Sequence, residues 1–333
     1  MSEAERVGQL LMVDCPTSGI ADATVTAIQT SHVGSVILDN TTSDGSAAIA
    51  SITAQLESDN PGIAKLFIAT DQEGGLVQRL QGEGFSTIPS AVMQGRLSPA
   101  TLRADAREWG AQLRHVGVNV DLAPVLDTVP SGSGPNPPIG DLDRQYGNTP
   151  TVVAIHGVAV AQGLADAGVV ATVKHFPGLG RVAGNTDLSA GVTDTVTTEH
   201  DAYLAPFAAA INVGVPFVMV STAIYARIDP GTPAIFSSKI VTTMLRDELG
   251  FKGVVITDDV GGAAQVASYP LGARAVNFIA AGGDIVLTVD ASQAADLTQA
   301  LLAKAAADPG FKAKVDAAAM RVLVAKQTHG LLG

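Results

Sequence analysis

Carboxylate side chains recur in this sequence directly after short apolar runs that are typical of strands. A lone Asp after a strand is most simply a helix N-cap or a turn former. Several carboxylates that converge on one place repel one another, and such a costly arrangement more often marks a functional site than a scaffold. The side chains at these strand ends are Asp14, Asp39, Asp71, Asp127, Lys174 with His175, Thr222 with Tyr225, Asp258 with Asp259, and Asp290.

Three chemistries use such a set of side chains. A metal hydrolase needs several His ligands, but of the six histidines only His175 follows a strand, so no metal is expected. A Schiff-base aldolase would use Lys174 as an uncharged amine, whereas neighbouring carboxylates keep a lysine protonated. Glycoside hydrolysis needs two carboxylates that flank the bond, together with donors and acceptors for sugar hydroxyls. The strand-end residues fit glycoside hydrolysis best.

The glycine-rich segments do not indicate a cofactor. The two glycines after Glu73 lack the Gly-Lys-Ser/Thr sequence of a phosphate loop, and they predict a tight turn that shapes the pocket. Residues 178–184 contain spaced glycines, but they do not follow the first strand as a dinucleotide fingerprint requires. We interpret 178–184 as a flexible loop and expect no cofactor.

Eight short apolar runs are the elements that must position these side chains. Continuous apolar runs are typical of parallel strands that are buried on both faces. Ala-rich segments of helical length separate them, including 99–116, 152–167, 200–213, 237–249 and 292–306. The expected strands are 8–13, 34–38, 65–70, 118–122, 169–173, 216–221, 253–257 and 284–289.

Strict alternation of strands and helices predicts parallel strands with right-handed crossovers. Eight units suit a closed barrel better than an open sheet with exposed edges. We therefore predict an α/β fold, a single-domain (β/α)8 TIM barrel over residues 1–333, with its site at the carboxyl ends of the strands. The expected helix N-caps are Ser237 and Ser292, and the expected helix stops are Gly117, Gly168, Gly214 and Gly250.

The composition of the chain disfavours nucleic acid and a membrane as partners, but it does not decide the cellular compartment. The chain has 20 Lys and Arg against 32 Asp and Glu, and its net charge of −12 disfavours nucleic acid. The most apolar stretch, 204–220, is interrupted by Pro206, Gly214 and Pro216, so no membrane span is expected. The single Cys15 excludes an internal disulfide. No signal peptide is visible, so a leader is either absent or trimmed, and we favour a location outside the cytoplasm.

Five blocks of sequence occur in order, each at an expected strand end. They are Asp71-Gln-Glu-Gly-Gly75, Leu122-Ala-Pro-Val-Leu-Asp127, Lys174-His-Phe-Pro-Gly178, Val218-Met-Val-Ser221 with Ile224 and Tyr225, and Val255-Ile-Thr-Asp-Asp259. Together they resemble glycoside hydrolase family 3, in its short, single-barrel bacterial β-N-acetylglucosaminidase branch. The resemblance covers essentially the whole chain.

The resemblance implies a role for particular residues. Asp258 corresponds to the nucleophile that forms a covalent glycosyl-enzyme in retaining hydrolysis. For Asp258 a helix N-cap is the alternative role, and for Arg79 it is an ion pair on the barrel rim. Carboxylates accept from sugar hydroxyls, while Lys and Arg donate to hydroxyl or acetamide oxygens. The residues that the resemblance implies for sugar binding are Asp71, Arg79, Arg144, Lys174 and His175.

The loop after the fifth strand departs from the family pattern. The family continues into His-Gly and then into an Asp-x-His pair that serves as general acid/base, but the corresponding residues here are Leu179, Asn185 and Asp187. We predict that Asp187 is itself the acid/base, with a pKa that rises when the loop closes and excludes water. Flanking glycines and Arg181 are expected to order the loop. Glu73 is the next candidate acid.

These residues and the resemblance together predict a retaining exo-β-N-acetylhexosaminidase. It would release terminal β-linked N-acetylglucosamine from peptidoglycan-derived or chitin-type oligosaccharides, as a monomer whose partner is the glycan. One alternative is a family 3 β-glycosidase or phosphorolytic enzyme of other sugar specificity. A second is a catalytically weak carbohydrate-binding barrel that has lost its acid, and a more distant third is the Lys174 aldolase.

Overall fold

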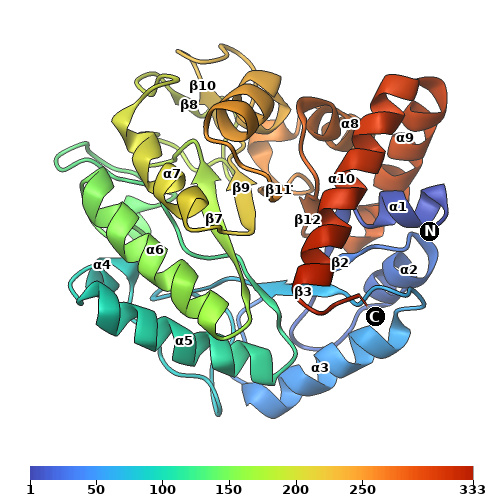
Figure 1. The fold of residues 1–333 in the computed structure, drawn as a ribbon, viewed down its shortest axis with the longest axis horizontal. Helices are drawn as coiled ribbons and strands as arrows, with labels where there is room; N and C mark the ends of the chain where they lie inside the picture. The colour runs from blue at the N-terminus through green and yellow to red at the C-terminus, as the bar shows by residue number, and fades with distance from the viewer. Residues whose placement is uncertain (333) are drawn as a thin grey trace.

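A ring of eight parallel strands forms the centre of the computed structural model, which describes residues 1–332 (Figure 1). Neighbouring strands follow the order β11-β9-β7-β6-β3-β2-β1-β12, and every pair in this order is parallel. A bridge between Ile256 and Ile285 joins the two ends of the order, and the Thr257 amide donates to the Ile285 carbonyl at 3.0 Å. The strands therefore form the (β/α)8 barrel that the sequence predicts.

All eight predicted strands are confirmed, with ends that move by a few residues. Nearly all of their residues are buried, which explains why each strand is a continuous apolar run rather than an alternating one. The strands are β1 Leu11–Cys15, β2 Ser35–Leu38, β3 Phe67–Thr70, β6 Val120–Asp121, β7 Val170–Phe176, β9 Phe217–Val220, β11 Val254–Thr257 and β12 Val286–Thr288.

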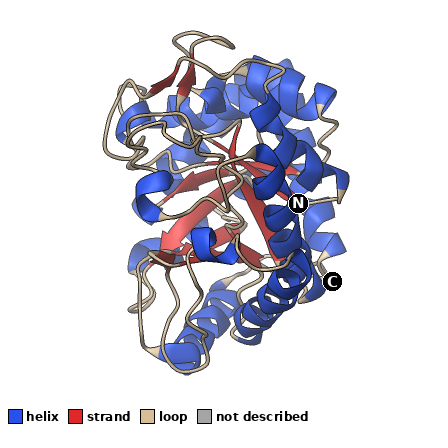
Figure 2. Ribbon diagram, turned by 90° about the vertical axis from the view of Figure 1, so that its left-hand side faces the viewer, coloured by secondary structure: helices blue, strands red, loops and turns tan. Residues whose placement is uncertain are grey.

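Helices surround the strands on the outside of the barrel (Figure 2). Each of the five predicted helical segments contains a helix, although 237–249 is wound as a π-helix. The helices are α1 Glu3–Gly8, α2 Asp22–Thr30, α3 Gly45–Asp59, α4 Ala91–Gln94, α5 Pro99–His115, α6 Pro150–Asp166, α7 Ala205–Asn212, the π-helix η4 Lys239–Glu248, α8 Leu271–Ala281, α9 Ala294–Ala307 and α10 Pro309–Thr328. In residues 1–332 no helix combines the length and the apolar character needed to cross a membrane.

The four predicted helix stops are confirmed, whereas the two predicted N-caps are not both confirmed, since Ser238 is the N-cap residue of η4. Ser237 Oγ accepts from the Ile240 amide at 3.3 Å as η4 begins. Ser292 is not an N-cap, because its own amide donates at 3.0 Å to Asp290, which caps the short 3-10 helix η6 (Ala291–Gln293) ahead of α9. The expected stops all have positive φ, between 72° and 84°, where a side chain would be strained: Gly117, Gly168, Gly214 and Gly250.

Two small sheets lie in the loops that follow the barrel strands. The hairpin of β4 (Gln72–Gly74) and β5 (Val77–Gln78) follows β3. The other sheet pairs β8 (Thr193–Asp194) with β10 (Ile224–Tyr225) in parallel, and so ties the loop after β7 to the loop after β9. These loops shape the end of the barrel where the carboxyl ends of the strands meet.

Candidate active site

One pocket of about 450 Å³ lies at the carboxyl end of the barrel, and all seven predicted site residues line it. Its volume falls in the range of small-molecule sites. Each side chain comes from a strand end or from the loop beyond it, as expected for a barrel with its site at this end. The seven residues are Asp71 after β3, Arg79 after β5, Arg144 after the 3-10 helix η1 (Gly140–Leu142), Lys174 and His175 in β7, Asp187 in the loop after β7, and Asp258 after β11.

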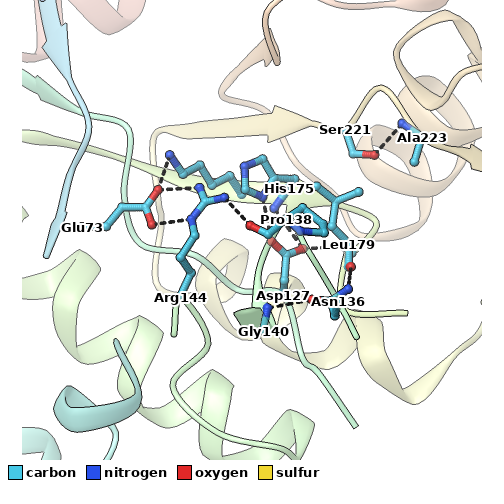
Figure 3. Close-up of polar contacts among 12 residues, drawn as sticks. Glu73, Asp127, Asn136, Pro138, Gly140, Arg144, His175, Leu179, Ser221 and Ala223 are labelled. Atoms are coloured by element: carbon cyan, nitrogen blue, oxygen red, sulfur yellow. Dashed lines mark hydrogen bonds and ion pairs between the residues drawn. The ribbon is translucent and has the colours of Figure 1, made fainter. Parts of the chain in front are cut away.

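A buried network of charges forms one wall of the pocket. Lys174 Nζ lies 2.5 Å from Asp71 Oδ1 and 2.7 Å from Glu73 Oε1. Arg144 binds Glu73 through two nitrogens, with Nη2 2.6 Å from Oε1 and Nε 2.8 Å from Oε2 (Figure 3). Its Nη1 also donates to the Pro138 carbonyl at 2.7 Å. The network therefore fixes both cations in geometries that leave further N–H donors for a ligand.

The charges in this network bear on two alternatives, Lys174 as an aldolase nucleophile and Glu73 as a general acid. Burial opposes the charged form of Lys174, but Asp71 and Glu73 outweigh it and raise the pKa of Lys174 above its ordinary value. A lysine held protonated is a poor Schiff-base nucleophile, so the aldolase alternative is not supported. Burial likewise opposes ionisation of Glu73, but the charges of Arg144 and Lys174 hold its pKa well below its usual range. Glu73 is thus an ion-pair partner and a poor candidate for a general acid.

Removing the charge of Glu73 should destabilise the fold. Glu73 side-chain exposure is 5%, so Glu73→Gln leaves Arg144 without its buried counter-charge and Lys174 with Asp71 alone. We expect a loss of about 3 kcal/mol in the free energy of unfolding, measured by denaturant titration. The matched control is Asp166→Asn, which removes an exposed ion pair with Arg103 and should leave the free energy of unfolding nearly unchanged. Equal effects of the two substitutions would contradict a structural role for the network.

His175 is held in one orientation by a fully buried carboxylate. Its Nδ1 lies 2.7 Å from Asp127 Oδ2 (Figure 3). Asp127 Oδ1 also accepts from the backbone amides of His175 at 3.3 Å and of Leu179 at 2.7 Å. The contact on Nδ1 leaves Nε2 as the ring nitrogen available to a ligand in the pocket. Asp127 therefore orients His175 and anchors the start of the following loop.

The two neighbouring carboxylates after β11 have different surroundings. Asp259 accepts three backbone hydrogen bonds, from Gly261 at 2.8 Å, Gly262 at 2.7 Å and Val289 at 3.1 Å. Asp258 accepts one, from the Asp259 amide at 2.9 Å. Both carboxylate oxygens of Asp259 therefore accept hydrogen bonds from backbone amides of the turn, so that Asp258 is not needed for this role. Both residues are half-buried, and Asp258, with fewer hydrogen bonds to backbone, has the greater capacity to contact a ligand.

Asp187 lies in the loop that spans from β7 to β8. Its carbonyl accepts from the Ala264 amide at 3.1 Å, and its amide donates to Asn185 Oδ1 at 2.9 Å, so Asn185 shapes the local turn. Asp187 is an exposed residue, but the pocket that it lines reduces hydration of the carboxyl. This loss of hydration, and then the negative charge of Asp258, raise the pKa of Asp187 to about 6. A carboxyl with this pKa can hold a proton near neutral pH.

The expected ordering of this loop by Arg181 has a clear structural basis. The Arg181 guanidinium lies 3.5 Å from the centre of the Tyr203 ring, and its Nη1 is 2.7 Å from Asp201 Oδ2. Both partners lie just beyond β8, on the far side of the loop in sequence. Arg181 therefore ties the start of the loop to the segment that follows its end.

The remaining strand-end carboxylates divide between the rim and the scaffold. Arg79 Nη2 lies 3.9 Å from Asp39 Oδ1, so Arg79 forms the rim ion pair while it also lines the pocket. Asp14 accepts from the Ala291 amide, and Asp290 caps η6. The expectation that all strand-end carboxylates form one site is therefore too broad, because Asp14 and Asp290 serve the backbone.

Comparison with known proteins agrees with this geometry. The Glycosyl hydrolase family 3 N terminal domain matches residues 3–325. A beta-hexosaminidase from Xanthomonas oryzae is 33% identical over 282 residues, which are 82% of this chain and 81% of that protein. A beta-hexosaminidase from Xylella fastidiosa is 35% identical over 283 residues, 81% of each chain.

Two solved structures resemble the chain in both sequence and fold. The beta-N-acetylhexosaminidase from Beutenbergia cavernae is 50% identical with a TM-score of 0.97, covering 98% of this chain and 99% of that one. A glycoside hydrolase family 3 beta-N-acetylglucosaminidase from Paenibacillus is 31% identical with a TM-score of 0.90, covering 99% of this chain and 63% of that one. Because the matched part is nearly the whole chain, it includes the pocket loops as well as the barrel.

Proposed function

Since the chain belongs to glycosyl hydrolase family 3, we propose that it is a retaining exo-β-N-acetylhexosaminidase. In this proposal residues 1–333 form one catalytic domain. The domain releases terminal β-linked N-acetylglucosamine from peptidoglycan-derived or chitin-type oligosaccharides. The observation that carries the proposal is the pair of Asp187 and Asp258 in one pocket, where loss of hydration and then the charge of Asp258 raise the pKa of Asp187 to about 6. One carboxyl is thereby suited to hold a proton beside a carboxylate.

The proposed reaction has two steps with the two carboxyls in different roles. In the first, Asp258 attacks the anomeric carbon, the glycosidic bond breaks, and the leaving oxygen takes the proton of Asp187. In the second, Asp187 removes a proton from water, the water oxygen bonds to the anomeric carbon, and the bond to Asp258 breaks. Two displacements restore the original configuration of the sugar and return both carboxyls to their starting states.

The other pocket residues bind the sugar in this proposal. Asp71 accepts from hydroxyls, while Lys174, Arg144 and Arg79 donate to hydroxyl or acetamide oxygens, and His175 offers Nε2. A single compact pocket suits a terminal sugar better than the middle of a long chain, which supports exo action. Because all seven side chains come from one chain, we propose that the monomer is active, which light scattering combined with assays at the same concentration would test.

The pH dependence of kcat/KM should report the proton on Asp187. The free enzyme is active when Asp187 is protonated, so kcat/KM on an N-acetylglucosamine disaccharide should fall as pH rises through about 6, the raised pKa of Asp187. The measurement is a pH profile of the wild type and of Asp187→Ala. The substituted protein should lack this basic limb. A basic limb that stays unchanged in Asp187→Ala belongs to another group and contradicts the assignment.

A panel of nitrophenyl β-glycosides, assayed with and without phosphate, tests the proposed function. We expect the highest kcat/KM on the N-acetylglucosaminide, with N-acetylglucosamine as product in both conditions. Phosphate should not accelerate turnover, because Asp187 is ionised after it has protonated the leaving group and repels an incoming anion. A preference for the glucoside, or accumulation of a sugar phosphate, would favour another family 3 specificity instead. No turnover of any glycoside would favour a binding protein.

A further inference from the structure

We propose that Gln265 is a positioning residue that sets where Asp187 lies relative to Asp258. This inference rests on the proposed role of Asp187 as acid/base. Gln265 belongs to the 3-10 helix η5 (Ala264–Val266), which follows Asp258 and Asp259 in the chain. Its side chain is buried, with 5% exposure, and contacts Val192 in the loop that carries Asp187.

The side-chain amide of Gln265 forms two hydrogen bonds with the backbone of a single residue, Val192. Gln265 Oε1 accepts from the Val192 amide at 2.8 Å, and Nε2 donates to the Val192 carbonyl at 3.2 Å. Val192 is in turn held by the barrel loops, because its carbonyl also accepts from the Ile224 amide at 3.0 Å, next to the β8–β10 pairing. The Gln265 side chain therefore fastens η5 to a fixed part of the mouth of the barrel.

The backbone of η5 then holds the segment that carries Asp187. The Gln265 amide donates to the Thr186 carbonyl at 3.0 Å, and the Ala264 amide donates to the Asp187 carbonyl at 3.1 Å. Among the described residues, these are the hydrogen bonds that connect 184–190 to the rest of the protein. The position of Asp187 thus depends on η5, and the position of η5 depends on the Gln265 side chain.

The connection back to the nucleophile is short and stiff. Asp259 follows Asp258 directly, and its carboxylate accepts from the amides of Gly261 and Gly262, which closes the turn that leads to η5. Retaining hydrolysis requires its two carboxyls about 5 to 5.5 Å apart. A misplacement of about 1 Å can cost a hundredfold in rate. The contacts of Gln265 therefore help to hold Asp187 at a constant position relative to Asp258.

The base of the same loop has separate anchors. Asn136 Nδ2 donates at 2.8 Å to the carbonyl of Leu179 (Figure 3). It also donates to the carbonyl of Val182 at 2.8 Å, and the Tyr225 hydroxyl donates to the Gly178 carbonyl at 2.9 Å. These contacts precede 184–190 in sequence. Loss of the Gln265 side chain should therefore loosen the part of the loop that carries Asp187 while the base of the loop stays in place.

Gln265→Met tests the inference, because it keeps the length of the side chain and removes its amide. On an N-acetylglucosamine disaccharide, whose leaving group needs a proton, kcat/KM should fall about 10-fold to 100-fold. On the nitrophenyl glycoside, whose first step needs little protonation, kcat/KM should change by less than about threefold. The basic limb of kcat/KM should move to lower pH, because an Asp187 released from the pocket wall and from Asp258 loses the causes of its raised pKa.

The matched control is Asn119→Leu. Asn119 is also 5% exposed, and its amide also makes two bonds to backbone, accepting from Ile68 at 2.9 Å and donating to Leu66 at 3.0 Å, at the opposite end of the barrel. It should lower stability without changing the ratio of the two rates or the pH limb. Gln265→Asn, a milder change, should shift both readouts in the same direction as Gln265→Met.

The outcomes separate this inference from the proposed function. If Gln265→Met lowers both rates equally and leaves the basic limb in place, as Asn119→Leu is expected to do, the positioning role is wrong. If Asp187→Ala itself shows no dependence on the leaving group, the proposed acid/base is wrong, whatever Gln265→Met does. A selective effect in Asp187→Ala and the same, smaller effect in Gln265→Met support both.

Discussion

Asp258→Asn and Asp258→Ala will each lose nearly all hydrolysis, on the order of 10⁴-fold in kcat, because no covalent glycosyl-enzyme can form without the attacking carboxylate. The loss should appear with nitrophenyl and natural substrates alike, since both need the nucleophile. The fold should survive, because Asp258 is half-buried at the pocket and accepts one hydrogen bond, from its neighbour Asp259. Initial rates on both substrates, with circular dichroism and thermal melting of each protein, check this prediction.

Asp259→Asn is the control for Asp258→Asn. The amide keeps the oxygen that accepts from Gly261 and Val289 but loses the bond to the Gly262 amide, so the turn weakens while the nucleophile remains. We expect a lower melting temperature with much of the activity retained. The opposite pattern, with activity lost in Asp259→Asn and retained in Asp258→Asn, would reverse the assignment of the two carboxylates.

Asp187→Ala should lower kcat/KM on substrates with poor leaving groups by roughly 10² to 10⁴-fold, the contribution typical of a general acid, and should lower kcat/KM on nitrophenyl glycosides far less. A nitrophenolate leaves without a proton, so its substrates bypass the missing acid in the first step. Added azide should then restore turnover on nitrophenyl substrates and give a glycosyl azide, because azide attacks the glycosyl-enzyme without needing a base. The prediction is checked by measuring rates on a natural disaccharide and on a nitrophenyl glycoside, and by identifying the glycosyl azide among the products.

Asn185→Ala is the matched control in the same loop. Asn185 accepts from the Asp187 amide, but an amide cannot relay a proton, so its loss should do less harm than loss of Asp187 and should give no azide rescue. Full activity of Asp187→Ala on a natural disaccharide would mean that another carboxyl is the acid. Glu73 is a poor replacement, because Arg144 and Lys174 hold it ionised.

The barrel could be predicted because its strands carry a strong local signal. A strand buried on both faces needs apolar residues at every position, and runs such as Val254–Thr257 meet that need without interruption. The stops at Gly117 and Gly250 are equally local, because positive φ favours glycine. Strand ends moved by a few residues, since hydrogen bonding between strands rather than composition decides where pairing stops.

The site could be predicted where a residue is fixed by its strand, and less well where loops meet. Lys174, His175 and Asp258 follow from the ends of β7 and β11. The two glycines after Glu73 predict a turn, but the ion pair of Glu73 with Arg144 joins residues 71 positions apart, a contact that no local pattern shows. Its signal was a carboxylate within the Asp-Gln-Glu-Gly-Gly block, too general to predict a partner.

Asp14 and Asp290 are residues that the sequence wrongly suggests as part of the site. They have the residue type and strand-end position of a site carboxylate, yet their oxygens accept from backbone amides of the segment after β12. The choice between binding a ligand and capping a backbone depends on which amides lie nearby in three dimensions. Sequence position alone cannot make that choice for a single Asp.

The central claim is that Asp258 forms a covalent bond to the sugar, and one measurement tests it directly. The protein is treated with a slow fluorinated analogue of N-acetylglucosamine bearing a good leaving group, digested, and examined by tandem mass spectrometry. The account predicts one sugar adduct per chain, with fragments that place it on Asp258, and no adduct in Asp258→Ala. An adduct on Asp259 or Asp127, or one that persists in Asp258→Ala, would contradict it.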